Sequence, residues 1–253
     1  MSTQMKQLYY ILSLIGFLTL INCGGSNSLG ALVGIGGSGF ISTGTVTSFG
    51  SVFVNGVEFD TNSSTFSIDD LDGTQQDLRI GMVVQVSGSI NADGVTGTAT
   101  HINYGENLSG AVSNLVITAT GVQFTILQQT VMVSATDTNF EGMVFADLVE
   151  GSVLEVSGFY NQSGFLKATY IEFKAVNSNG DTVVEIKGQI NGLTGNRFQV
   201  QGVDVDGTAA NLTDLPNGLQ NNTFVKVEGT YANGVIAATE IKGQDSLSEE
   251  EDV

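Results

Sequence analysis

The chain has 253 residues, of which 41% are hydrophobic, with 33 glycines, one proline and no tryptophan, a composition typical of globular β-rich proteins. Eight basic residues against 26 acidic ones give a net charge of −18, which argues against nucleic acid as a partner because phosphate binding requires Lys and Arg. A single cysteine and a single histidine exclude an internal disulfide framework, a CxxC site and a two-histidine metal site.

The first 22 residues have the pattern of a signal peptide. Their apolar stretch, from Leu8 to Ile21, is short for a transmembrane helix, since about 20 apolar residues span a bilayer. It ends in Leu-Ile-Asn-Cys, which resembles the lipobox of bacterial lipoproteins, although Asn22 stands where Gly, Ala or Ser is usual. We therefore predict a lipoprotein signal peptide over 1–22, acylation of Cys23 and attachment to a membrane through this lipid. The alternative is an ordinary signal peptide or an uncleaved anchor with an incidental cysteine.

A Gly/Ser-rich segment follows the cysteine. Residues 23–41 lack periodicity and predict a flexible tether between the lipid and a folded body. Gly24, rather than Asp, after the cysteine resembles the sorting pattern of outer-membrane lipoproteins. The predicted location is therefore the outer membrane of a bacterial cell envelope, on its periplasmic face or at the cell surface.

The same β-unit then occurs three times. We predict repeats over 42–107, 108–183 (with a linker) and 184–243, followed by an acidic disordered tail over 244–253. Their principal strands read GMVVQVSG, GSVLEVSG and NTFVKVEG, and each is followed by a Gly turn and by ATHI, ATYI or ATEI. Self-similarity of this kind indicates one supersecondary unit per repeat.

Each repeat also contains a hairpin-like stretch before its principal strand. VFVNGVEF at 52–59 and FQVQGVDV at 198–205 place a glycine between alternating apolar residues, a strong hairpin signal. The second repeat has FTILQQTVMV, without the glycine, so we expect a different turn there.

The principal strands alternate with a period of two, which is typical of a strand with one buried face. The buried positions are Val84 and Val86, Leu154 and Val156, and Val225 and Val227. Gln85, Glu155 and Lys226 lie between them and should point outward. Because Val83, Val153 and Phe224 place apolar groups on the same outer face, we expect these three residues to pack against a neighbouring element or repeat.

About five short strands per repeat and no long amphipathic helix predict an all-β fold. Our first choice is three tandem small antiparallel barrels of OB-like type. A continuous β-sandwich built from all three copies is the alternative. Since domains of this size are marginally stable alone, neighbouring repeats should pack together.

The stretch GIGGSGFISTGTVTSFGSVFVNGVEFDT at 34–61, followed by L-x-x-G-x-x-V-x-V-x-G and A-T-x-I, resembles an uncharacterised bacterial family defined by a domain of unknown function. The resemblance covers nearly all of 34–243. It implies a signal-bearing lipoprotein of the cell envelope with tandem OB-like β-repeats. It supplies no catalytic residues.

The search for chemistry in the sequence finds no catalytic arrangement. His101 occupies the variable position of A-T-x-I, where the other copies have Tyr170 and Glu240, and this indicates an outward strand position. The acid-rich turns at 69–73 and 204–207 lack the EF-hand spacing and are interpreted as solvated turn acids. We therefore predict no catalytic residue, no bound metal and no cofactor.

The repeated residues are all of the scaffold type: Gly, Val, Ala, Thr and Ile. They indicate a non-enzymatic structural or interaction module with a protein or glycan partner. The first alternative is a carbohydrate- or calcium-binding module, and the second is a hydrolase using acidic residues. Any function should be sought at the outward positions that differ between the copies: Gln85, His101, Glu155, Tyr170, Lys226 and Glu240.

Overall fold

The computed structural model describes residues 40–176, 183–212 and 214–244. The predicted signal peptide, Cys23 and nearly all of the predicted tether and tail lie outside these residues. Strand β1 begins at Phe40, so the last two residues of the predicted tether belong to the first repeat instead. No helix in the described part of the chain is long and apolar enough to cross a membrane.

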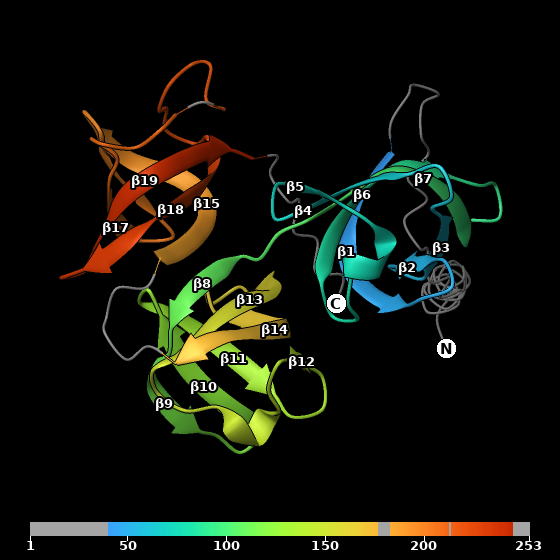
Figure 1. Cartoon of the computed structure of the whole chain (residues 1–253), viewed down its shortest axis with the longest axis horizontal. Coiled ribbons are helices and arrows are strands. Elements are labelled where there is room, and N and C mark those ends of the chain that lie inside the picture. The colour runs from blue at the N-terminus through green and yellow to red at the C-terminus, as the bar shows by residue number, and fades with distance from the viewer. Residues whose placement is uncertain (1–39, 177–182, 213, 245–253) are drawn as a thin grey trace, which may run out of the picture. The chain divides into compact units, whose positions relative to one another are not determined.

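The first repeat forms a five-stranded barrel (Figure 1). Its antiparallel pairs are β1–β2, β2–β3, β1–β6 and β6–β7, and a parallel pair between β3 and β7 closes it. A small hairpin, β4–β5, extends the sheet beyond β7 through a parallel β4–β7 pair. The strands are β1 (Phe40–Ser48), β2 (Val52–Val54), β3 (Val57–Asp60), β4 (Thr65–Ile68), β5 (Leu71–Gly73), β6 (Val83–Ile90) and β7 (Thr96–Tyr104).

The second repeat has the same strand order, and the parallel pair β11–β14 closes its barrel. Its first strand is divided at Val112 into β8 and β9, which pair with β13 and β10 respectively. The strands are β8 (Leu108–Ala111), β9 (Ser113–Ile117), β10 (Gly121–Ile126), β11 (Gln129–Ser134), β12 (Asn139–Glu141), β13 (Ser152–Tyr160) and β14 (Leu166–Val176). Single 3₁₀ turns, η1 (Gln75–Asp77) and η2 (Phe145–Asp147), precede the principal strand in the first and second repeats.

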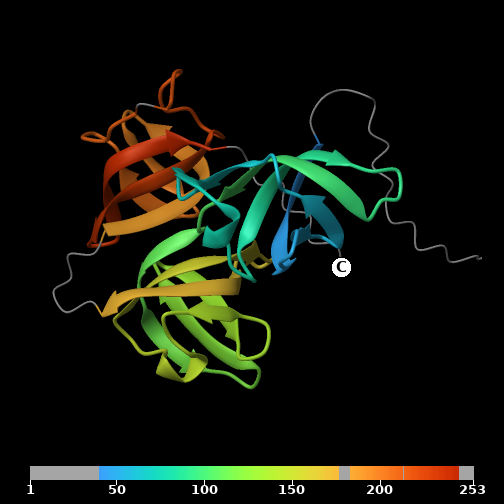
Figure 2. The same ribbon diagram turned by 45° about the vertical axis from the view of Figure 1, so that its right-hand side comes forward.

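The third repeat forms the barrel drawn in orange and red in Figures 1 and 2, closed by the parallel pair β17–β19. Its strands are β15 (Val183–Thr194), β16 (Arg197–Val200), β17 (Val203–Asp206), β18 (Phe224–Ala232) and β19 (Val235–Gly243). The all-β class and the three tandem repeats are thus confirmed. Because each repeat closes on itself, the alternative of one continuous sandwich is wrong, while the OB-like assignment stays a prediction.

The alternating residues of the principal strands fill the barrel interiors, as the period of two predicts. All six predicted apolar residues are fully buried: Val84, Val86, Leu154, Val156, Val225 and Val227. The isoleucines of A-T-x-I are also fully buried, and the alanines nearly so. This burial explains why the repeated residues are the same in the three copies, since each fills an equivalent place in a barrel core.

The turn in the hairpin of the second repeat departs from the prediction. Leu127 and Gln128 have φ angles of 49° and 64°, close to the 51° and 76° of Asn55 and Gly56 in the first repeat. The expectation of a different turn is therefore wrong. Burial of the Leu127 side chain in the core compensates for placing a non-glycine residue in the left-handed region.

None of the three apolar residues on the outer face is exposed. Val83 and Val153 are buried and Phe224 is half-buried. The Val83 backbone N–H donates to the Ser157 hydroxyl in the second repeat at 3.0 Å. The outer faces of the principal strands are therefore covered at these positions by neighbouring parts of the protein, as predicted from the apolar side chains there.

The second and third repeats share backbone pairing as well as side-chain packing. Strand β8 pairs antiparallel with β15, with Leu108 opposite Ile186 and Ser109 opposite Glu185. One apolar core extends from the second barrel into the third. The second and third barrels therefore share one sheet and one apolar core.

Candidate functional site

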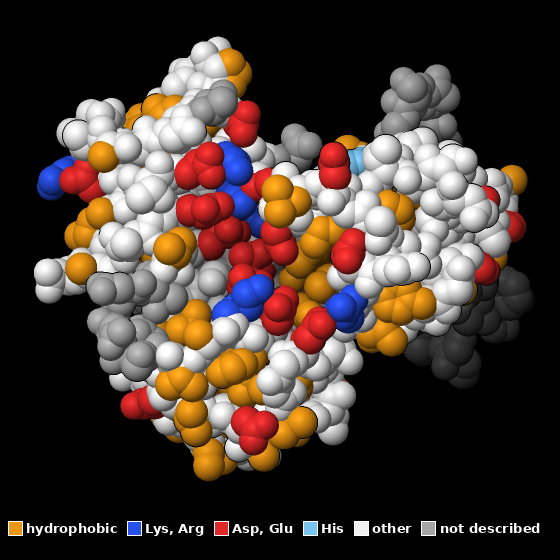
Figure 3. Space-filling view, in the orientation of Figure 1, with side chains coloured by type: hydrophobic (Ala, Val, Ile, Leu, Met, Phe, Trp, Pro, Cys, Tyr) orange, Lys and Arg blue, Asp and Glu red, His pale blue; other side chains and the backbone are white. Residues whose placement is uncertain are grey.

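Charged side chains from all three repeats meet in what we call the junction cluster. In Figure 3 acidic and basic side chains gather near the middle of the face in view. The ion pairs and the close carboxylates within the cluster connect residues far apart in the sequence. Its members are Asp69, Asp70, Glu106, Glu155, Glu185, Lys187, Lys226 and Lys242.

The first repeat contributes Asp69 and Asp70 from the tight turn between β4 and β5. Their φ angles are 49° and 65°, a conformation that Asp tolerates better than most residues with a side chain. The Asp69 backbone N–H donates to the Tyr104 carbonyl at 3.0 Å, which holds the turn at the end of β7. Asp69 and Asp70 remain exposed, as predicted for turn acids, but Asp70 also pairs with Lys226 of the third repeat.

The linker between β7 and β8 contributes Glu106, which is buried together with Asn107. The Asn107 side-chain oxygen accepts from the Gly158 N–H at 2.8 Å, and its backbone carbonyl accepts from the Lys187 N–H at 3.0 Å. Asn107 thus fixes the linker to both later repeats. Glu106 and Asn107 are not predicted from any motif in the sequence. The one signal for them is the short linker that joins two barrels.

The remaining members project from the outer faces of strands in the second and third repeats. Glu155 lies on β13, Glu185 and Lys187 on β15, Lys226 on β18 and Lys242 on β19. In the β15–β18 register, Lys187 is opposite Lys226 and Glu185 is opposite Glu228. The side chains of such cross-strand neighbours lie close together on one face.

Lys226 is the centre of the ion pairs. Its side chain is only 5% exposed, and its ammonium group lies 2.8 Å from Glu228 Oε1 and 3.4 Å from Glu185 Oε2. It also contacts Asp70 of the first repeat, whose carboxylate Lys242 reaches at 3.5 Å. Burial alone would lower the pKa of Lys226, but the charge of Glu185 and the hydrogen bonds to Asp70 and Glu228 raise it. Lys226 is therefore a permanently charged link between the first and third repeats.

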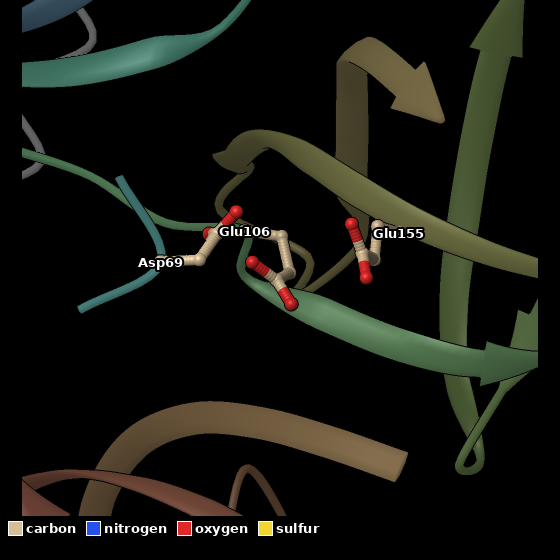
Figure 4. Close-up of side chains that lie close together, drawn as sticks. All are labelled: Asp69, Glu106 and Glu155. Carbon is tan, nitrogen blue, oxygen red and sulfur yellow. The ribbon is translucent and has the colours of Figure 1, made fainter. Parts of the chain in front are cut away.

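Three carboxyl groups lie together beside this lysine. Asp69, Glu106 and Glu155 come from the β4–β5 turn, the linker and β13, and their oxygens lie within 4.8 Å of one another (Figure 4). Desolvation and a hydrogen bond with Glu106 raise the pKa of Asp69 to about 8. Burial would also raise the pKa of Glu106, but the hydrogen bond from Asp69 and the charge of Lys187 outweigh it and lower this pKa. Asp69 and Glu106 therefore share a proton at neutral pH.

The three carboxylates have the oxygen ligands that calcium prefers. Positive charge nevertheless reaches them from the protein itself, because Lys187 lies beside Gly105. A Cβ atom at Gly105 would be 2.3 Å from Lys187 Nζ and 3.6 Å from Asp69 Oδ1. Together with Lys174, 3.0 Å from Glu155 Oε2, this ammonium group supplies positive charge to the trio from the protein itself.

The shared proton makes stability depend on pH. Asp69 has a pKa of about 8 in the folded protein against an ordinary 3.8, and burial raises that of Glu185 to about 7. The folded state thus holds protons that the unfolded chain releases at lower pH, so the free energy of unfolding falls as pH rises from about 4 to about 8. Solvent screening reduces the contribution of these two carboxyl groups to the free energy of unfolding. We therefore expect the melting temperature to fall by about 2–4 °C between pH 5 and pH 8.

Thermal melts of Asp69→Asn should show a smaller fall, because this variant carries no titrating proton there, while Asp72→Asn in the same hairpin should behave like the natural protein. Equal pH dependence in all three proteins would contradict the shared proton. A rise in melting temperature on adding millimolar Ca²⁺, absent in Asp69→Asn, would show instead that the trio holds a metal ion.

The prediction that six variable positions lie on the surface is wrong for Gln85, Tyr170 and Lys226, which are buried. Tyr170 and Lys226 do point away from the interiors of their own barrels, but both contact the first repeat. Tyr170 packs edge-on against Tyr104 of the first repeat, with ring centroids 6.4 Å apart. Its hydroxyl donates to Glu141, which also pairs with Arg79 of the first repeat at 3.0 Å.

The other three positions remain partly accessible. Glu155 belongs to the junction cluster, and Glu240 pairs with Lys242 at 3.2 Å. His101 Nδ1 lies 2.8 Å from the Thr65 hydroxyl on the neighbouring strand. The structure therefore brings Glu155 and Lys226 into one cluster, with Glu240 at its margin, and leaves Gln85, His101 and Tyr170 outside it.

Three stretches of the chain, residues 39–103, 109–172 and 187–242, match the family described as Domain of unknown function (DUF5666). The chain belongs to this family. Each match begins near the first strand of a barrel and ends in its last strand, so one DUF5666 unit corresponds to one barrel. The predicted membership of an uncharacterised repeat family is confirmed. A search of curated proteins finds no match to the chain.

Proposed function

We propose that this DUF5666 protein is a lipid-anchored protein of the bacterial cell envelope whose three barrels act together as a non-enzymatic structural or interaction module. The observation that carries the proposal is the junction cluster, where charged side chains of different repeats pair with one another. Asp70 of the first repeat meets Lys226 and Lys242 of the third. Asp70, Lys226 and Lys242 therefore hold the first and third repeats together through ion pairs.

Two further contacts support action as one body. Strand pairing between β8 and β15 makes the second and third barrels parts of one sheet. Tyr170 of the second repeat is buried within the apolar core of the first. Each contact crosses a boundary between repeats, so separation of the barrels would expose apolar surface and break hydrogen bonds.

Scanning calorimetry of the full chain tests this proposal. If the repeats act as one body, they should unfold in a single cooperative transition whose calorimetric and van't Hoff enthalpies agree. Two or three resolved transitions, or a van't Hoff enthalpy far below the calorimetric one, would show that the barrels are independent and would contradict the proposal.

The proposed lipid anchor depends on Cys23, which follows a short apolar stretch and precedes a Gly/Ser-rich segment. Cys23→Ser should abolish acylation, since the lipid requires the thiol, and the protein should be lost from washed membranes. Mass spectrometry of the N-terminal peptide reads out the acyl mass, and Ser26→Ala provides a control in the same segment. Detection of an unmodified Cys23 in the membrane-bound natural protein would rule out the anchor.

A further inference from the structure

A polar cleft lies between the first and third repeats and has no part in the proposed function. Its volume is about 490 Å³, within the range of roughly 300–1,000 Å³ for ligand sites in proteins. One wall is formed by β4, β7 and the β4–β5 turn, and the other by the loop between β17 and β18 together with the end of β19.

The side chains that line this cleft are mainly neutral hydrogen-bonding groups. Four of them carry amides: Asn103, Asn217, Gln220 and Gln244. Each amide both donates and accepts hydrogen bonds, and His101 on the opposite wall from Asn217 offers its Nε2 atom, because its Nδ1 atom is engaged with Thr65. Such groups match the vicinal hydroxyls of a sugar, which also donate and accept.

The same residues disfavour other ligands. Among the described residues no Lys or Arg lines the cleft, while Asp70 and Asp214 do, so a phosphate or another anion would be repelled. In the same part of the chain a divalent cation would find only these two carboxylates, and Asp70 is already paired with Lys226 and Lys242. An apolar ligand would leave the amides without hydrogen-bond partners, which is costly.

The loop wall is held in shape before any ligand binds. Leu215 is buried in the third barrel's core, and its carbonyl accepts from the Gly218 N–H at 2.9 Å. Pro216, the only proline in the chain, has a fixed φ between them. A wall that is already ordered loses little conformational entropy on binding.

We propose that this cleft binds a neutral oligosaccharide. The amides, His101 and Asp214 supply hydrogen bonds to the sugar hydroxyls. The half-buried ring of Phe224 lines the cleft and offers an apolar surface for the C–H face of a pyranose ring.

Isothermal titration calorimetry of the full chain, in a detergent without a sugar head group, tests the proposal. The probes are maltohexaose, cellohexaose, chitohexaose and xylohexaose. At least one should bind saturably with a dissociation constant below about 1 mM. His101→Ala and Asn217→Ala, one from each wall, should each weaken this binding about 5-fold through loss of a hydrogen bond.

Phe224→Leu should weaken binding by a similar factor. Phe165→Leu and Asn191→Ala, which change the same residue types outside the cleft, should leave the affinity unchanged, and melting temperatures of all variants check that they are folded. The absence of saturable binding for all four hexasaccharides would overturn the proposal. Unchanged affinity in folded His101→Ala, Asn217→Ala and Phe224→Leu would also overturn it.

Discussion

Replacing Lys226 by methionine should lower the free energy of unfolding by about 3–5 kcal/mol. Methionine preserves most of the side-chain volume, so the change removes the ammonium group and little packing. Glu185 and Glu228, which are opposite each other on β15 and β18, would then lose the ammonium group they share, and Asp70 would keep only its longer pair with Lys242 at 3.5 Å. Like charges repel strongly in a partly desolvated environment. Removing one member of a buried ion pair also leaves the charge of its partner uncompensated.

Urea denaturation at pH 7 measures this effect, and Lys174→Met provides a matched control. Lys174 also pairs with two glutamates, at 3.0 Å from Glu155 and 3.1 Å from Glu172, but its side chain is 41% exposed. Exposed pairs contribute about 0–1 kcal/mol, so this control should be nearly neutral. A loss for Lys226→Met no greater than that for Lys174→Met would show that the junction cluster adds nothing to stability.

Gly158→Ala should destabilise the protein by about 3 kcal/mol, through a clash rather than a lost contact. A Cβ atom at Gly158 would lie 2.1 Å from the Lys167 carbonyl oxygen on β14. That oxygen belongs to the backbone, so it cannot move without disturbing the barrel. The β13–β14 register shifts between Ser157 and Gly158, which indicates a bulge where the two backbones approach closely.

Equivalent glycines occupy the same place in the other repeats. Cβ atoms at Gly88 and Gly229 would lie 2.1 Å from the Thr98 oxygen and 2.3 Å from the Ala237 oxygen, again at register shifts. This explains why each principal strand ends its V-x-V-x-G pattern with glycine. Alanine at either position should therefore be as harmful as at Gly158.

Gly164→Ala in the turn of the same β13–β14 hairpin serves as the control for Gly158→Ala. Gly164 has a φ of 76° but nothing within 4 Å of a Cβ atom, so alanine there should cost only about 1 kcal/mol of backbone strain. Both variants are compared by urea denaturation. Equal losses at the two positions would contradict the close approach of the strands as the reason for the repeated glycine.

Local patterns predict the barrels well because each strand's period of two depends on its own residues. Val84, Leu154 and Val225 are buried for this reason, and the Asn55–Gly56 turn follows from backbone preferences alone. The turn at Leu127–Gln128 shows the limit, since burial of Leu127 in the core overrides those preferences. The candidate site was less predictable, because Glu106 lies in a linker that has no motif.

The three repeats, their strands and the side chains inside each barrel follow from local residue patterns. Whether an outward side chain contacts water or another repeat depends on how the barrels pack against one another. Tyr170 and Lys226 have the alternation of surface residues, yet both are buried where repeats meet. Alternation shows only which face of a strand points away from its own core. Contacts between repeats join residues far apart in the sequence, such as Tyr104 with Tyr170 and Asp70 with Lys226, so no local pattern predicts them.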